Sequence, residues 1–200
     1  MAIFVHMTEH EERPRRRLDA RSLRGLAHPL RMQLLEALRH NGPATASQLG
    51  ERLGESSGAT SYHLRQLAAH GFVEDAPEHG KGRERWWRAV DQGIVLDTDD
   101  FKSAGPEVRG LAEVFLHEVA NTHARKLSTW LSTRDRWSEG WTRASDMSDA
   151  TLRLTPELAD ELIQKMHALI DDYRDRVPDK DTPDSEQVRI HTHLFPIETD

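Results

Sequence analysis

The sequence has 200 residues, of which 36% are hydrophobic and 30% are charged, and it contains no cysteine. This length is enough for two folded units. No apolar run approaches the roughly 18 to 20 residues that cross a bilayer, which excludes a membrane protein. The lack of cysteine excludes disulfides and thiolate metal sites, so we expect a cytoplasmic protein.

The formal net charge of −7 is unevenly distributed along the chain. Residues 13–88 contain 14 Lys/Arg and 8 Asp/Glu, a net charge of +6, whereas residues 91–200 contain 13 and 23, a net charge of −10. An acidic surface repels a phosphate backbone, but a basic N-terminal half can bind one. Two domains of unlike pI without such a role would show the same asymmetry, so the motifs must decide.

The first residues, MAIFVH followed by Met7, lack the basic region and cleavage site of a signal peptide. They fit either a native start or a cloning junction with the native start at Met7. We predict that residues 1–17 are a tag-like or disordered basic segment. It contains Arg13, Arg15, Arg16 and Arg17, which form either an arm on DNA or a solvated tail.

Helical periodicity predicts two helices joined by a sharp bend over residues 19–41. The first ends before His28-Pro29, because proline disfavours helix in the residue ahead of it, and Pro29 starts the second. Asn41-Gly42 is typical of a helix end. The apolar stripe of the second helix consists of Leu30, Leu34, Leu35 and Leu38.

The next segment predicts two more helices with a tight turn between them. Thr45 and Gln48 match a capping box for a helix that ends at Gly54. Ser56 or Ser57 caps a helix that extends to about His70 and buries Thr60, Leu64, Leu67 and Ala68. Two short helices joined by a glycine-containing turn are typical of a helix-turn-helix motif.

Two β-prone runs, residues 72–76 and 84–90, enclose a loop with two glycines and two cations. They predict a hairpin with a basic tip, which is a wing. Alternation alone leaves open whether Trp86 or Trp87 faces the core. We therefore predict a winged helix-turn-helix DNA-binding domain over residues 18–92.

The fourth predicted helix carries polar residues opposite its apolar stripe, where they would meet the major groove. Arg binds guanine bidentately, Gln binds adenine, and hydroxyl groups bind base edges or phosphates. His63 lies beside this face and is predicted to be a hydrogen-bonded packing residue instead. The wing cations would contact phosphates. The predicted DNA-binding residues are Ser57, Gly58, Ser61, Tyr62, Arg65, Gln66, Lys81, Arg83 and Arg85.

Residues 23–90 resemble the winged helix domain of ArsR-like regulators, in the HPLRMQLLEAL run at 28–38 and the SGATSYHLRQLAAHGFV run at 57–73. The resemblance covers under half of the chain. It implies a bacterial homodimer that binds an inverted repeat, commonly as a repressor released by a signal.

A long helix is predicted over residues 106–137, with two apolar faces. One consists of Val108, Ala112, Phe115 and Val119, and the other of Leu116, Ala120, Ala124, Leu127 and Leu131. A helix with two apolar faces must bury both, either within one monomer or by pairing with a second copy. Pairing with a second copy is favoured, because a regulator that binds an inverted-repeat operator acts as a dimer.

The remaining chain predicts a small α+β unit. A strand at Leu152 and Leu154 precedes a helix from about Pro156 to Arg176, and a second strand covers residues 188–194. The predicted fold class is therefore mainly α with small β (α+β), with residues 93–200 as a dimerisation and effector domain.

Metal sensing is not predicted. Metal-sensing members of the resembled family use cysteines or Asp/His/Glu sets on a C-terminal helix, and this sequence departs from both patterns. His117, Glu118 and His123 do not share a helical face. His191 and His193 would share a strand face but have no carboxylate partner. We predict neither a metal nor another cofactor.

Trp130, Trp137 and Trp141 either line an apolar pocket for a small-molecule effector or simply pack. No catalytic motif is recognisable, so an enzyme is not expected. The sequence predicts a homodimeric regulator of double-stranded DNA. The alternative is a winged helix that serves as a protein-interaction module without operator binding.

Overall fold

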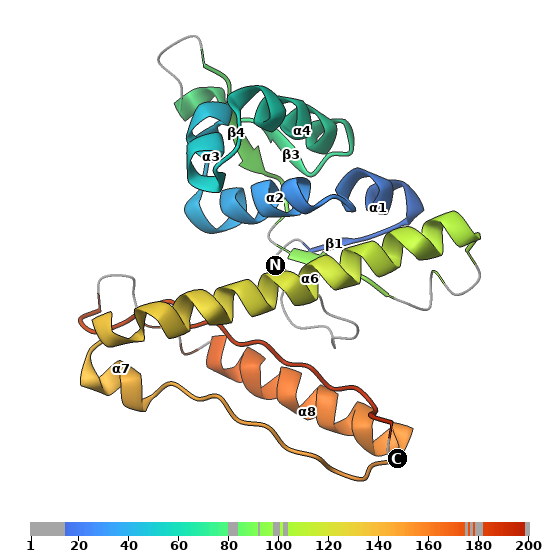
Figure 1. Cartoon of the computed structure of the whole chain (residues 1–200), viewed down its shortest axis with the longest axis vertical. Coiled ribbons are helices and arrows are strands. Elements are labelled where there is room, and N and C mark those ends of the chain that lie inside the picture. Colours follow the sequence, from blue (N-terminus) through green and yellow to red (C-terminus); the bar gives the residue numbers. More distant parts are fainter. Residues whose placement is uncertain are drawn as a thin grey trace. The chain divides into compact units, whose positions relative to one another are not determined.

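The computed structural model of the chain describes residues 15–79, 84–91, 93–97, 101, 104–174, 176, 178 and 182–198. It divides into two compact units, an N-terminal unit at Met1–Thr122 and a C-terminal unit at His123–Asp200. The fold is mainly helical with small sheets, which confirms the predicted class (Figure 1). Among the described residues, no helix is long and apolar enough to span a membrane.

The helices of the N-terminal unit begin at capping residues. They are α1 (Ala20–Leu26), α2 (Pro29–Asn41), α3 (Ala46–Leu53) and α4 (Ser57–Ala69). The Asp19 carboxylate accepts a hydrogen bond from the backbone N–H of Ser22 at 2.7 Å and caps α1. His28 caps α2, and Pro29 occupies its first turn, where no backbone donor is needed.

The turn between α3 and α4 depends on glycine. The predicted capping box of Thr45 and Gln48 starts α3, and Gly54 ends it in the left-handed conformation at φ 69°. A Cβ at Gly50 would lie 2.7 Å from the Glu55 carbonyl oxygen, so α3 and the turn approach more closely than a side chain allows. Ser56 then caps α4.

A three-stranded antiparallel sheet packs with these helices. Its strands are β2 (Ala44–Thr45), β3 (Val73–Asp75) and β4 (Trp86–Ala89), with β4 in the centre, and β3 and β4 form the predicted hairpin. Trp87 pairs with Asp75 on one side and Ala44 on the other. The Trp87 side chain is buried, whereas that of Trp86 is half-buried. Trp87 is therefore the tryptophan that faces the core, a question that the sequence left open.

A second, parallel pair joins β1 (Arg15–Arg17) to β5 (Gly93–Val95). The Leu18 N–H continues the pairing with a 2.9 Å hydrogen bond to the Val95 carbonyl. Residues 15–17, which the sequence assigns to a tail-like segment, therefore form a strand. Three consecutive arginines show no apolar alternation, so this strand carries no sequence signal.

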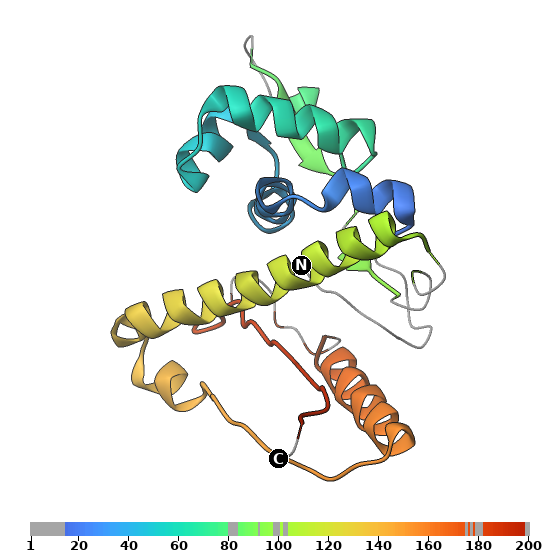
Figure 2. The same ribbon diagram turned by 45° about the vertical axis from the view of Figure 1, so that its right-hand side comes forward.

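The core of the N-terminal unit lies between the helices and the sheet, where α4 contacts α1, α2 and α3. Figure 2 shows α4 lying across the unit beside the hairpin. The predicted stripes of α2 and α4 are buried. The fully buried large side chains are Phe72, Phe115, Leu18, Leu23, Leu26, Leu34, Leu35, Leu49, Leu64, Leu67, Ile94 and Leu96.

The helix α6 spans Pro106–Thr133, a little shorter than predicted, and a 3-10 turn η2 (Arg134–Arg136) follows it. Its first apolar face is buried at Val108, Ala112, Phe115 and Val119. Its second face is exposed, with Leu116 at 38%, Leu127 at 40% and Leu131 at 39%. A single copy of the chain thus covers one of the two predicted faces.

The C-terminal unit is helical among its described residues. It contains the end of α6, the short helix α7 (Glu139–Arg143) and α8 (Pro156–Arg174). The two predicted strands here are wrong: residues 148–155 and 186–198 have no strand structure. Alternating apolar residues form a strand only when a neighbouring strand pairs with them, and here Leu152 and Val188 are exposed at 62% and 65%.

Candidate nucleic-acid interface

The outer face of α4 presents a row of polar side chains. Ser57, Gly58, Tyr62 and Arg65 are exposed, with Tyr62 at 52%, while Ser61 and Gln66 are half-buried. On the opposite face Thr60, Leu64 and Leu67 are fully buried and hold the helix on the core. The predicted row therefore lies on one face of a rigid helix.

Arg65 is the principal candidate for base contact on this face. Among the described residues, no hydrogen bond or ion pair involves its guanidinium group. A guanidinium group without an internal partner keeps all five N–H donors for a ligand. The helix α4 thus carries an unengaged cation on its exposed row.

The space beside Gly58, in the N-terminal turn of α4, is open. A Cβ built at Gly58 would meet only the Ser56 hydroxyl, at 4.0 Å. The protein itself therefore leaves room for a side chain at this position. Space at the start of a helix allows a phosphate to approach the free N–H groups.

The wing cation Arg85 is already engaged. Its Nη2 donates to the Asp75 Oδ2 at 2.7 Å, its Nε donates to the Asp75 Oδ1, and its Cζ lies 4.1 Å from the Trp87 ring centroid. The bond to Asp75 raises the pKa of Arg85 above its ordinary value. Arg85 therefore has fewer donors for a phosphate than the sequence suggests. Lys81 and Arg83 lie outside the described residues.

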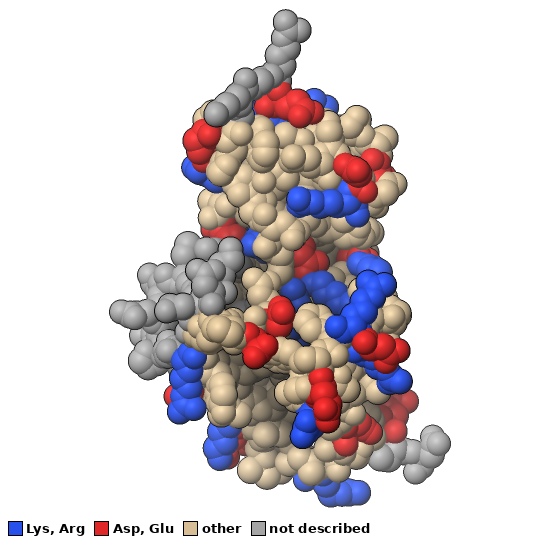
Figure 3. Space-filling view, turned by 90° about the vertical axis from the view of Figure 1, so that its left-hand side faces the viewer, with Lys and Arg blue, Asp and Glu red and all other residues tan. Residues whose placement is uncertain are grey.

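The charges near the wing are balanced. Arg88 donates to the Glu74 Oε1 and the Glu78 Oε1, both at 2.7 Å. On the face shown in Figure 3, the Lys and Arg side chains are scattered and have Asp and Glu side chains near them. This face does not carry a single-sign surface, so the basic excess of the N-terminal half is not a continuous patch there.

His63 of α4 packs against His28, the residue that caps α2. The His63 ring centroid lies 4.4 Å from that of His28 and 5.1 Å from that of Tyr62. Burial lowers the pKa of both histidines, and the positive charge of Arg31 lowers it further. His63 packs as the sequence predicts, but its buried Nδ1 has no hydrogen-bond partner among the described residues, so the hydrogen-bonded part of the prediction is wrong. Its contact with His28 was not predicted, because the two histidines are 35 positions apart and no local spacing connects them.

The C-terminal candidates occupy a different environment. Trp130 and Trp141 are half-buried, and Trp137 is 40% exposed. The Trp141 Nε1 donates a hydrogen bond to the Asp184 carbonyl at 3.2 Å, so the indole N–H already has a partner within the protein. A pocket that is described below is lined by residues of the N-terminal unit, and none of these three tryptophans lines it.

Three histidines of the C-terminal unit come together in space. The rings of His123 and His191 stack at 3.7 Å and 9°, and the His123 Nδ1 lies 3.1 Å from the His193 Nε2. Parallel stacked rings point their lone pairs in parallel, not at a common ion. In the described part of the chain, no group of three or more His, Cys, Asp or Glu side chains could hold a metal.

Comparison with known proteins agrees with the N-terminal fold. Residues 26–76 match the family described as "Helix-turn-helix domain". With the hairpin of β3 and β4 beside α4, this part of the chain is a winged helix-turn-helix domain, the kind of domain that DNA-binding transcription regulators carry. The predicted winged helix-turn-helix domain is thereby confirmed.

Three solved structures are similar to the chain. Reduced HlyU from Vibrio cholerae is 22% identical over 48% of this chain and 80% of its own, with a TM-score of 0.31. The homodimeric winged helix-turn-helix domain of Mb0332 from Mycobacterium bovis, described as a possible ArsR-family regulator, is 24% identical over 54% and 82%, with a TM-score of 0.32.

The third is the transcriptional regulator Tm0710 from Thermotoga maritima, 12% identical over 74% of this chain and 78% of its own, with a TM-score of 0.28. Among curated protein sequences, none matches this chain.

Proposed function

We propose that the protein is a homodimeric transcription regulator that binds an inverted-repeat operator through α4, acts as a repressor, and catalyses no reaction. The observation that carries the proposal is the exposed row on α4 that includes the unengaged Arg65. A helix held on a buried apolar stripe presents such a row to the major groove, where Arg reads guanine.

The contacts divide into two kinds. Ser61, Tyr62, Arg65 and Gln66 lie where base edges would be reached, whereas Ser57 and Gly58 lie at the helix start beside the backbone phosphates. Lys81 and Arg83 supply wing contacts, and Arg85 adds to them only through donors that Asp75 does not occupy. The base contacts would set specificity, and the wing would set affinity and its salt dependence.

Homodimer formation is proposed on the second face of α6. Leu116, Leu127 and Leu131 lie on the same face of α6 and are all exposed, so they form an uncovered apolar face. Pairing of this face with its copy would bury the three leucines across a two-fold axis and place two copies of α4 on successive half-sites. Repression and release by a small molecule are favoured by the ArsR-like resemblance.

The same proposal keeps Trp130, Trp137 and Trp141 as candidate effector contacts in the C-terminal unit. Trp130 and Trp141 are half-buried, so their fluorescence would report a ligand that binds beside them. A saturable change in tryptophan emission during a screen of small molecules supports this assignment. A screen in which only non-saturable changes occur would remove it.

The proposal is tested by nuclear magnetic resonance of the full chain with a pool of random-sequence duplexes at low salt. We expect shifts and broadening of backbone amides between Ser57 and Gln66, reduced in Arg65→Ala and unchanged in Arg153→Ala. Arg153 is a matched control because it is exposed and, within the described residues, unpaired. Amide changes away from α4, or none, would favour the protein-interaction module instead.

A further inference from the structure

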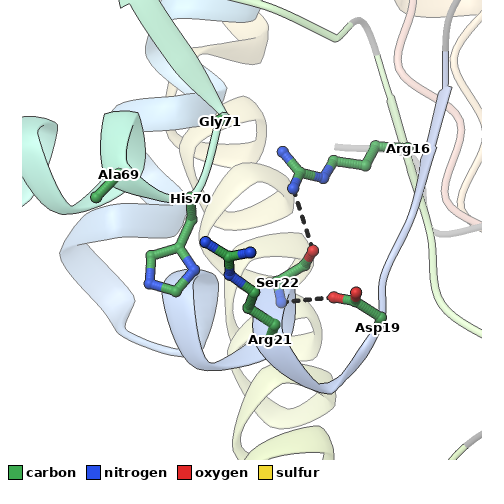
Figure 4. A pocket seen from close by; sticks show the side chains of 7 residues that line it. All are labelled: Arg16, Asp19, Arg21, Ser22, Ala69, His70 and Gly71. Atoms are coloured by element: carbon green, nitrogen blue, oxygen red, sulfur yellow. Dashed lines mark hydrogen bonds between the residues drawn. The ribbon is translucent and has the colours of Figure 1, made fainter.

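A pocket of about 300 Å³ lies between α1 and the C-terminal end of α4 (Figure 4). All of its lining residues belong to the N-terminal unit, and the proposed DNA contacts are not among them. The lining side chains used below are those of Arg16, Asp19, Arg21, Ser22 and His70, together with Gly71.

The guanidinium group of Arg16 is held in place by its neighbours. Its Cζ lies 4.3 Å from the centroid of the Phe72 ring, and its Nη2 donates to the Ser22 hydroxyl at 3.2 Å. A Cβ at Gly71 would lie 3.3 Å from the Arg16 Nη1, so the bare glycine lets the cation approach the backbone. A cation fixed in this way needs little reorganisation to bind an anion.

A second cation faces the same space. Figure 4 shows the guanidinium groups of Arg16 and Arg21 directed toward the gap between α1 and the end of α4. In the part of the chain that the structure describes, no ion pair involves either arginine. The nearby Asp19 carboxylate is occupied by the Ser22 backbone N–H at 2.7 Å. The pocket therefore has two cations and one engaged carboxylate.

The remaining wall is neutral and rigid. Burial lowers the pKa of His70, and the charges of Arg21 and Arg31 lower it further, so the imidazole is uncharged at neutral pH. Its ring packs on Gly25, where a Cβ would lie 2.3 Å from the His70 Cγ. His70 is also the C-cap of α4, which joins the pocket wall directly to the end of that helix.

We propose that this pocket binds a small free oxyanion, a carboxylate or phosphate group of a small molecule, between the guanidinium groups of Arg16 and Arg21. Guanidinium forks bind such groups through paired, charge-assisted hydrogen bonds. The ligand bridges α1 to the end of α4. A regulatory effect on DNA binding rests on the proposed function, whereas anion binding itself does not.

The test is titration of the full chain with inorganic phosphate at constant ionic strength, with chloride as the compensating salt. The readout is the backbone amide shifts of Arg21, Ser22 and Gly71. We expect saturable shifts, with affinity about tenfold lower in Arg21→Gln, as for loss of a charge-assisted bond. Arg153→Gln, a matched loss of one exposed arginine, leaves the affinity unchanged.

Arg21→Gln is the primary variant because Arg21 is exposed and its guanidinium group makes no hydrogen bond to another described residue. Arg16→Gln, in contrast, also removes the contacts to Phe72 and Ser22. Shifts that do not saturate, or that are the same in Arg21→Gln, overturn the proposal. It is also overturned if Arg21→Gln weakens binding of a random-sequence duplex as much as it weakens phosphate binding, because the pocket would then be a DNA backbone contact.

Discussion

Two glycines within helices of the N-terminal unit have opposite roles, and substitution distinguishes them. In α1 a Cβ at Gly25 would lie 2.3 Å from the His70 Cγ, whereas in α6 a Cβ at Gly110 would have no neighbour within 4 Å. We expect Gly25→Ala to lower the free energy of unfolding by about 1 to 3 kcal/mol through overpacking. Gly110→Ala should raise it by roughly 1 kcal/mol through helix propensity.

Urea unfolding monitored by circular dichroism measures both changes. Equal effects of the two substitutions would contradict the close packing of His70 on α1.

Three histidines at or near α4, His28, His63 and His70, predict that the stability of the protein depends on pH. Burial lowers the pKa of His28, His63 and His70 from 6.5 in the folded protein, so the unfolded chain binds more protons below that pH. Stability is therefore fully present above about pH 6.5 and is lost as the pH falls toward the folded pKa values.

Urea midpoints at pH 5, 6 and 7 measure this loss, and His63→Gln should make it smaller. The comparison between variant and parent isolates His63, because His123 and His191, whose pKa values burial lowers to about 4, add the same slope to both proteins. An identical pH dependence in His63→Gln and the parent protein would show that His63 does not contribute.

At the scale of elements, the helices of the N-terminal unit and the hairpin strands β3 and β4 agree with the sequence-based predictions, whereas the other short strands do not. Capping residues and the apolar stripes of α2, α3 and α4 are local signals, and they place these helices within a few residues. The pairing of β1 with β5 joins segments more than 70 residues apart, and β1 is a run of arginines. Such pairing depends on tertiary context that local alternation does not encode.

The second face of α6 predicts a variant that separates dimer formation from folding. Leu127→Glu combined with Leu131→Glu introduces charges at positions 40% and 39% exposed in one copy. We expect the dimer to dissociate in light scattering after size exclusion, because buried unpaired charges are costly, while helical circular dichroism is retained.

Val114→Glu is the matched control, since Val114 is 49% exposed on α6 but lies off both apolar faces. If both proteins remain dimeric, the proposed interface is wrong.

At the scale of the whole molecule, the sequence predicts which residues form the outer row of α4, but it does not predict the contacts around the wing or the pocket. The outer row of α4 follows from helix geometry once the buried stripe of Thr60, Leu64 and Leu67 is known. The pairing of Arg85 with Asp75 could not be predicted, because it depends on the register between β3 and β4, which local patterns do not give. The Arg16 pocket depends on the unpredicted strand β1.

The basic excess of the N-terminal half predicts salt-dependent DNA binding at this scale. Affinity for a random-sequence duplex should fall linearly with the logarithm of salt concentration, with a slope set by the number of phosphates contacted. Because Arg85 and Arg88 are paired internally, we expect Arg88→Ala to leave the slope unchanged. Fluorescence anisotropy at several salt concentrations measures the slope, and a marked decrease in Arg88→Ala would contradict this expectation.

The measurement that tests the central claim most directly is selection from a pool of random-sequence duplexes followed by sequencing, for the parent protein, Arg65→Ala and Arg153→Ala. The account predicts that the parent protein and Arg153→Ala enrich the same inverted repeat, and that Arg65→Ala loses the repeat or relaxes it at the positions Arg65 contacts. Absence of enrichment by the parent protein at low salt would contradict operator binding.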